Sequence, residues 1–133
     1  YLRKYGHLPN ITFAPKVPKG KVQHVLKLCN LLYFSVHQSE VWRYGQSLNK
    51  VVDYMLSGKP IVASYTGFPS MINESNCGVF VPAGDPNSLL REIERFSCLD
   101  DQALEVIGLR GRSWILRNRS YQDLARQYLA LMA

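Results

Sequence analysis

Short apolar runs alternate along this chain with segments in which apolar residues recur every three or four positions. Runs of the first kind are typical of buried parallel strands, and segments of the second kind are typical of helices that bury one face. The predicted strands are 10–13, 31–36, 60–64 and 78–82. The predicted helices are 18–29, 47–57, 70–73 and 86–96, followed by an all-helical end over 100–133. Alternating strands and helices predict an α/β fold, with a parallel sheet covered by helices on both faces.

The segment 47–64 gives the strongest local prediction, a helix that passes directly into a buried strand. Ser47 can cap the start of the helix, and Gly58 suits the left-handed conformation that commonly ends one. Pro60 prevents the helix from continuing. The apolar residues that share one face of this helix are Val51, Val52, Met55 and Leu56.

The first turn of this predicted helix is polar, with Ser47, Asn49 and Lys50 close together. A lysine there opposes the helix dipole, at a cost of roughly 0.3–1 kcal/mol unless an anion is nearby. Free backbone N–H groups, a hydroxyl, an amide and an ammonium group together could bind a phosphate. A capped surface helix with a solvated lysine explains the same residues and remains the alternative.

Three loops are predicted to lie at one edge of the sheet. The loops 14–18, 37–47 and 65–70 all follow predicted strands, and parallel α/β sheets bind ligands beyond the carboxyl ends of their strands. The polar segment 37–46 is also longer than the usual connection of about 2–6 residues, and long loops are often functional. A ligand site is therefore expected at this edge.

Size and composition indicate a single soluble domain over residues 1–133. The formal net charge is +6, but no nucleic-acid motif accompanies it, so we do not expect a nucleic-acid partner. Three widely spaced cysteines argue against a disulfide framework and a metal site, and they fit a reducing compartment. No apolar run reaches the ~18 residues of a membrane span. Because Tyr1 is not a natural start, we interpret the chain as a fragment.

Four motifs, in the same order along the chain, resemble the donor-binding C-terminal half of glycosyltransferase family 4. The resemblance is strongest to bacterial enzymes of surface-polysaccharide synthesis. It implies the GT-B architecture, with a Rossmann-like sheet whose first strands precede this sequence. The motifs are Ser47-Leu48-Asn49-Lys50-Val51-Val52-Asp53-Tyr54-Met55, Gly58-Lys59-Pro60-Ile61-Val62, Gly67-Phe68-Pro69 and Gly78-Val79-Phe80-Val81-Pro82-Ala83-Gly84-Asp85-Pro86.

The resemblance also implies roles for single residues. Asp53 lies five positions before Gly58 and matches the acid that contacts the ribose of the donor, a role in which one carboxylate accepts hydrogen bonds from two hydroxyls. Val17 matches the segment that borders the nucleobase. The residues implied in binding the donor diphosphate are Ser47, Asn49, Lys50 and Gly67.

Two positions depart from the family pattern. Gly45 stands where the family has a second acid, and Ser70 stands where it often has a glutamate. Glu40, in the long loop, is a candidate catalytic substitute for the missing acid, and the catalytic residue is otherwise unassigned. The departures leave an alternative open, a non-catalytic nucleotide- or phosphate-binding module with the same fold.

The expected activity is retaining transfer of a hexosyl or N-acetylhexosaminyl group from a nucleotide-diphosphate sugar. No metal and no cofactor are expected, since no Asp-x-Asp motif is present. The products would be lipopolysaccharide, capsule or exopolysaccharide. The implied partners are an N-terminal acceptor domain of the same polypeptide and a lipid-linked acceptor at the inner face of the cell membrane. The protein is therefore expected to be cytoplasmic, and residues 1–133 alone are expected to be inactive.

Overall fold

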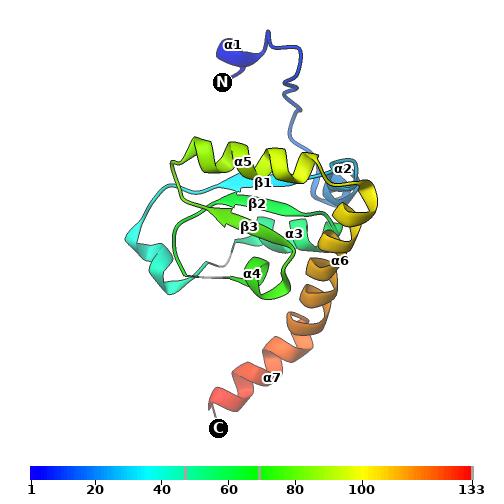
Figure 1. Ribbon diagram of the computed structural model, residues 1–133. Coiled ribbons are helices and arrows are strands. Elements are labelled where there is room, and N and C mark those ends of the chain that lie inside the picture. Colours follow the sequence, from blue (N-terminus) through cyan, green and yellow to red (C-terminus); the bar gives the residue numbers. More distant parts are fainter. Residues whose placement is uncertain (47, 69, 133) are drawn as a thin grey trace.

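The computed structural model describes residues 1–46, 48–68 and 70–132 of the chain. Three parallel strands form one sheet in the order β1-β2-β3 (Figure 1). Their bounds are Leu32–Ser35 for β1, Ile61–Ser64 for β2 and Gly78–Val81 for β3. Leu32 is paired with Ile61, which in turn is paired with Gly78. The α/β fold class predicted from the sequence is confirmed.

Helices cover both faces of this sheet (Figure 1). Helix α5 packs against β2 and β3 on one face, while α3, α4 and α6 lie on the other side, with α6 packed on both α3 and α4. The segment before α2 and the helix α7 extend away from the sheet in opposite directions. The helices are α1 Leu2–Tyr5, η1 Lys19–Lys21, α2 Val22–Lys27, η2 Glu40–Tyr44, α3 Asn49–Ser57, α4 Met71–Ser75, α5 Pro86–Ser97, α6 Asp101–Asn118 and α7 Tyr121–Met132, of which η1 and η2 are 3₁₀ helices.

The core lies on both sides of β2, because successive side chains of a strand point to opposite faces. Ile61 contributes to the larger cluster together with Val51 and Met55 of α3, and all three are fully buried. Val62 contributes to the smaller cluster with Phe96 of α5. Burying one such side chain stabilises the fold by about 1.5–3 kcal/mol. The apolar face predicted for the helix at 47–57 is thus the face that packs on the sheet.

The turn between α3 and β2 confirms the predicted end of this helix. Gly58 ends α3 in the left-handed conformation, with a φ of 71°. The helix begins at Asn49, and the predicted cap, Ser47, lies outside the described residues. Leu48 holds the N-cap position in an extended conformation, and its side chain packs against the larger core cluster.

The N-terminal third of the chain differs from the prediction. Residues 10–13 do not form the predicted strand, and Ile11 and Phe13 are 38% and 43% exposed. A strand needs a neighbour for its backbone N–H and C=O groups, and β1 is paired only with β2 in the described part of the chain. The predicted helix 18–29 is reduced to η1 and α2, which ends at Lys27, so that Leu28 is left 83% exposed.

The helix α5 starts as the sequence predicts. The Asp85 carboxylate accepts hydrogen bonds from the backbone N–H groups of Asn87 and Ser88, at 3.1 and 3.0 Å, and Pro86 occupies the first turn. The hydroxyl of Ser88 also donates to this carboxylate. These hydrogen bonds lower the pKa of Asp85, with those from Ser88 contributing most.

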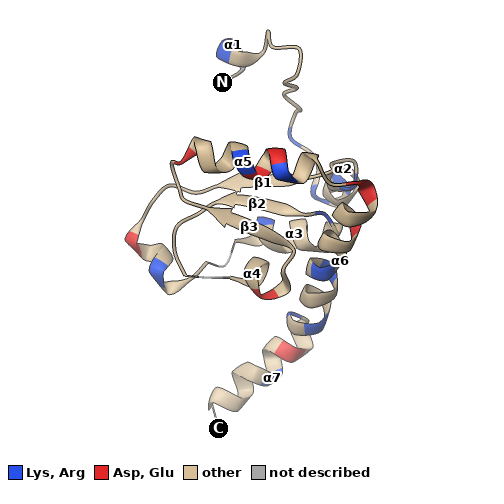
Figure 2. Cartoon of the chain, viewed as in Figure 1, with Lys and Arg blue, Asp and Glu red and all other residues tan. Residues whose placement is uncertain are grey.

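Basic residues gather on the later turns of α6, after acidic residues at its start, while α5 carries both signs of charge (Figure 2). Between Val106 and Asn118 the sequence has Arg110, Arg112 and Arg117 and no acidic residue. Within the described ranges, none of the helices has both the length and the apolar character that crossing a bilayer requires.

Candidate functional site

A depression of about 500 Å³ lies between the loops that follow β1 and β2. Both loops leave the carboxyl ends of their strands, which is where parallel α/β sheets bind ligands. The residues that line it are Gln38, Ser39, Glu40, Arg43, Thr66 and Gly67. The structure therefore has a concave surface at the edge where the sequence predicts a site.

The two loops are joined at the backbone carbonyl of Trp42. Its oxygen accepts hydrogen bonds from the N–H groups of Gly45 and Phe68, at 3.1 and 2.9 Å. It also accepts from the hydroxyl of Tyr65, at 3.1 Å. The indole N–H of Trp42 donates to the carbonyl of His37, at 2.8 Å. This hydrogen bond lies within the loop after β1 and stabilises its conformation.

Close approach between the loops requires glycine at position 67. A Cβ atom on Gly67 would lie 2.5 Å from the carbonyl oxygen of Trp42 and 2.6 Å from the Tyr65 hydroxyl oxygen. Any larger side chain must therefore push the loops apart. Packing of the two loops therefore explains why position 67, which the sequence analysis assigned to the site, is a glycine.

A third loop is tied to the same edge. The hydroxyl oxygen of Thr66 accepts a hydrogen bond of 2.9 Å from the N–H group of Ala83, which follows β3. The loop after β2 is therefore hydrogen-bonded both to the loop after β1 and to the loop after β3.

The charged groups of the depression face solvent. Arg43 and Glu40 form an ion pair at 3.4 Å, with side chains that are 65% and 94% exposed. Exposed pairs of this kind contribute at most about 1 kcal/mol, so both groups can reorient toward a ligand. A guanidinium group binds phosphate oxygens in a bidentate manner, and a carboxylate accepts hydrogen bonds from sugar hydroxyls. The arrangement thus suits a ligand that carries both phosphate and sugar.

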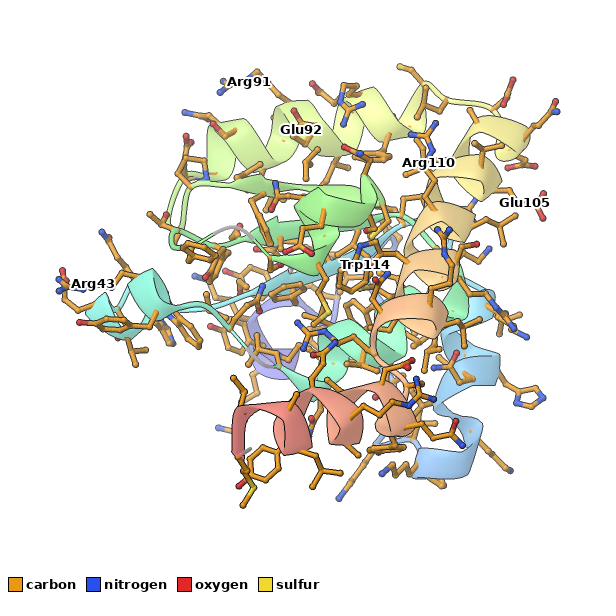
Figure 3. All side chains as sticks on the ribbon, turned by 90° about the horizontal axis from the view of Figure 1, so that it is seen from below. Arg43, Arg91, Glu92, Glu105, Arg110 and Trp114 are labelled. Carbon is orange, nitrogen blue, oxygen red and sulfur yellow. The ribbon has the colours of Figure 1, made fainter. Side chains whose placement is uncertain are left out.

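A second depression, of about 430 Å³, lies between α4 and α6. It is lined by Glu74, Ser75, Val106, Leu109, Arg110, Ser113, Trp114 and Arg117. Arg110 and Trp114 lie far from Arg43 in Figure 3, so the two depressions are separate. No group of three or more potential metal ligands occurs within the described part of the chain.

Comparison with known proteins identifies the family. The model of the family described as "Glycosyl transferases group 1" matches residues 1–98. The chain belongs to the group 1 glycosyl transferases. The resemblance inferred from the four motifs is confirmed at the level of the family.

Two individual proteins are similar to this glycosyl transferase chain. The protein named colanic acid biosynthesis glycosyltransferase WcaL, from Salmonella typhimurium, is 26% identical over 83 residues, which cover 62% of this chain and 20% of that protein. The structure of sucrose-phosphate synthase from Thermosynechococcus elongatus superposes with a TM-score of 0.73 at 20% identity, covering 98% of this chain and 31% of the synthase. The second similarity shows a shared fold. The chain spans less than a third of the length of either protein.

The glycosyl transferase structure brings together only some of the predicted site residues. Glu40 and Gly67 line the depression, whereas Asn49, Lys50 and Asp53 of α3 are not among its lining residues. Ser47 falls outside the described residues. The roles predicted for these residues in binding diphosphate and ribose remain predictions.

The α3 residues have contacts of their own. Asn49 is exposed, and the Lys50 ammonium lies 5.9 Å from the centre of the Phe34 ring, a contact that offsets part of the dipole cost expected from the sequence. Asp53 is half-buried, and its backbone carbonyl accepts a hydrogen bond of 2.9 Å from the side chain of Gln23. Val17, predicted to border the nucleobase, is half-buried and lines neither depression.

Sequence reasoning did not assign a role to Arg43, Thr66 or Tyr65. Arg43 and Thr66 lie within the loops 37–47 and 65–70, which the sequence analysis placed at the expected ligand site. Their positions in the chain were therefore predictable, but their contacts were not. Tyr65 follows the apolar strand β2 directly, and nothing in the local pattern indicates that its hydroxyl would bind the neighbouring loop.

Proposed function

We propose that this chain is the donor-binding part of a retaining glycosyltransferase that uses a nucleotide-diphosphate sugar. The observation that carries the proposal is the depression at the carboxyl ends of β1 and β2, in a chain of this family. It is lined by Arg43 and Glu40, and Gly67 allows the two loops around it to lie close together. The relative named for colanic acid biosynthesis supports a role in making surface polysaccharides such as lipopolysaccharide, capsule or exopolysaccharide.

The proposed mechanism relies on charge and position. Arg43, with Asn49 and Lys50 at the start of α3, would stabilise the diphosphate as it leaves, because cationic and N–H groups lower the energy of developing negative charge. Asp53 would accept hydrogen bonds from the ribose hydroxyls, and Glu40 would face the transferred sugar. Neither a metal nor a cofactor is part of this scheme.

The remaining parts of the proposal concern the transferred sugar, the acceptor and the place in the cell. The transferred group would be a hexose or an N-acetylhexosamine. The acceptor would be a lipid-linked sugar at the inner face of the cell membrane, held by a further domain of the same polypeptide. The protein would work in the cytoplasm, at the membrane surface.

One observation favours the alternative of a non-catalytic nucleotide-binding module. Ser70, at the position where related sequences often have a glutamate, is only 7% exposed, and its hydroxyl oxygen accepts from the N–H group of Ile72 to cap α4. This residue serves the fold and offers no carboxylate to a ligand. Binding of nucleotide by the intact protein without turnover of any donor sugar would support the module over the enzyme.

Asp53→Ala tests the proposed ribose contact. In the intact protein we expect nucleotide-sugar affinity to fall by about 1–3 kcal/mol, the scale of leaving hydrogen-bonding partners unsatisfied, or about 5- to 150-fold. Calorimetric titration with UDP-glucose, GDP-mannose and ADP-glucose would measure it. Glu105→Ala removes the same charge from an exposed position on α6 and should leave the affinity unchanged. Equal affinity for wild type and Asp53→Ala would remove Asp53 from the site.

A further inference from the structure

Tyr65 occupies the place where the two loops around the depression meet. It follows β2 directly, and its backbone N–H donates to the carbonyl of Val81 at the end of β3, at 2.9 Å. Its side chain is 3% exposed. The ring centre lies 4.9 Å from that of Phe80 and 6.0 Å from that of Trp42. The ring is therefore held firmly, and the position of its hydroxyl is set by packing.

The hydroxyl of Tyr65 reaches one carbonyl in each loop. Its oxygen lies 3.1 Å from the carbonyl oxygen of Trp42 and 3.0 Å from that of Phe68. A phenol has one proton, so the two carbonyls share it. A phenol is already protonated at neutral pH, and burial raises the pKa of Tyr65 further.

These two carbonyls belong to the neighbours of lining residues. Trp42 precedes Arg43, and Phe68 follows Gly67. The carbonyl of Trp42 also accepts from the N–H groups of Phe68 and Gly45, so the three donors converge on one oxygen. Losing the phenolic proton would leave the carbonyl of Phe68 without this donor and weaken the link between the loops.

We propose that Tyr65 is a positioning residue, which clamps the loops after β1 and β2 and so fixes the distance between Arg43 and Gly67 across the donor depression. The assignment of the ligand rests on the proposed function. The clamp itself rests only on the hydrogen bonds above. Tyr65 does not line the depression, so it acts through the loops and not by touching the donor.

Tyr33 provides a matched control. Its hydroxyl also links β1 to β2, because it donates to the hydroxyl oxygen of Ser64 at 3.0 Å. This bond joins the strands and not the loops, and the side chain is 42% exposed. Tyr33→Phe thus removes a phenolic hydroxyl that links β1 to β2, and it leaves the hydrogen bonds of Tyr65 in place.

The test compares wild type, Tyr65→Phe and Tyr33→Phe in the intact protein. Tyr65→Phe keeps the ring and its packing, so it should fold and unfold cooperatively. We expect the backbone amides of Gly45 and Phe68 to exchange with deuterium at least tenfold faster in Tyr65→Phe. We also expect the nucleotide that wild type binds best among UDP, GDP and ADP to bind at least fivefold more weakly. Tyr33→Phe should match wild type in both measurements. A protein with 3-fluorotyrosine at position 65 keeps the hydroxyl that Tyr65→Phe lacks, and it should also match wild type.

The outcomes separate the clamp from the proposed function. Unchanged amide exchange in Tyr65→Phe overturns the clamp. Faster exchange with unchanged nucleotide affinity overturns the positioning role. A wild-type protein that binds none of the three nucleotides overturns the proposed function, and the exchange data then decide the clamp alone.

Discussion

Gly108→Ala is expected to destabilise the protein, although alanine is normally better than glycine in a helix by about 1 kcal/mol. Gly108 lies in α6, where the helix crosses the turn between α3 and β2. A Cβ atom there would collide with the carbonyl of Gly58 and lie 2.8 Å from the Cα of Lys59. Backbone atoms cannot rotate away as a side chain can. We therefore expect the overpacking cost to reach the upper part of its usual range of about 1–3 kcal/mol.

The matched control for this variant is Gly20→Ala. Gly20 lies in η1, and nothing would lie within 4 Å of a Cβ atom added to it. Its stability should change by no more than about 0.5 kcal/mol, the usual effect of a surface substitution. Chemical denaturation of the intact protein measures both. If Gly108→Ala were as stable as wild type, α6 could not pack against the Gly58 turn as described.

Gly67→Ala is expected to abolish ligand binding at the depression, with a loss of at least about 100-fold, or about 2.7 kcal/mol. The added methyl group would overlap the carbonyl of Trp42 and the hydroxyl of Tyr65. The loops must then separate, which displaces Arg43 and the groups that line the depression. Titration with UDP, GDP and ADP measures the loss, and Gly20→Ala should bind as wild type does.

Folding must be kept apart from binding in this variant. Gly67 contacts Tyr65, which belongs to the larger core cluster, and Trp42, which packs against that cluster. The nearest atoms to the added methyl group belong to these two residues and not to α3 or β2, so we expect Gly67→Ala to lose some stability but to keep a cooperative unfolding transition. Wild-type affinity in Gly67→Ala would show that the depression is not the binding site.

The sheet and most of its helices could be predicted because their patterns are local. The apolar run at 61–63 indicates a short buried strand, since it lies between Pro60 and a polar loop. Gly58 signals the end of α3 because a left-handed residue is needed there. Asp85 followed by Pro86 signals the start of α5 in the same way. Each of these features depends on residues within one or two turns of chain.

The errors concern features that depend on distant residues. Residues 10–13 have the composition of a strand, but no described strand pairs with them. A depression lies at the carboxyl edge where the sequence predicts a site, yet the contact between Tyr65 and the Trp42 carbonyl links residues 23 positions apart. Local patterns carry no information about such a contact.

The claim that the depression between the loops after β1 and β2 binds the donor has one most direct test. Hydrogen–deuterium exchange of the intact protein should be recorded with and without UDP, GDP and ADP. We expect the nucleotide that binds to slow exchange at 38–45 and 66–68, the loops that border the depression. Slower exchange confined to 106–117, beside the separate depression between α4 and α6, would contradict the claim, as would binding of none of the three nucleotides.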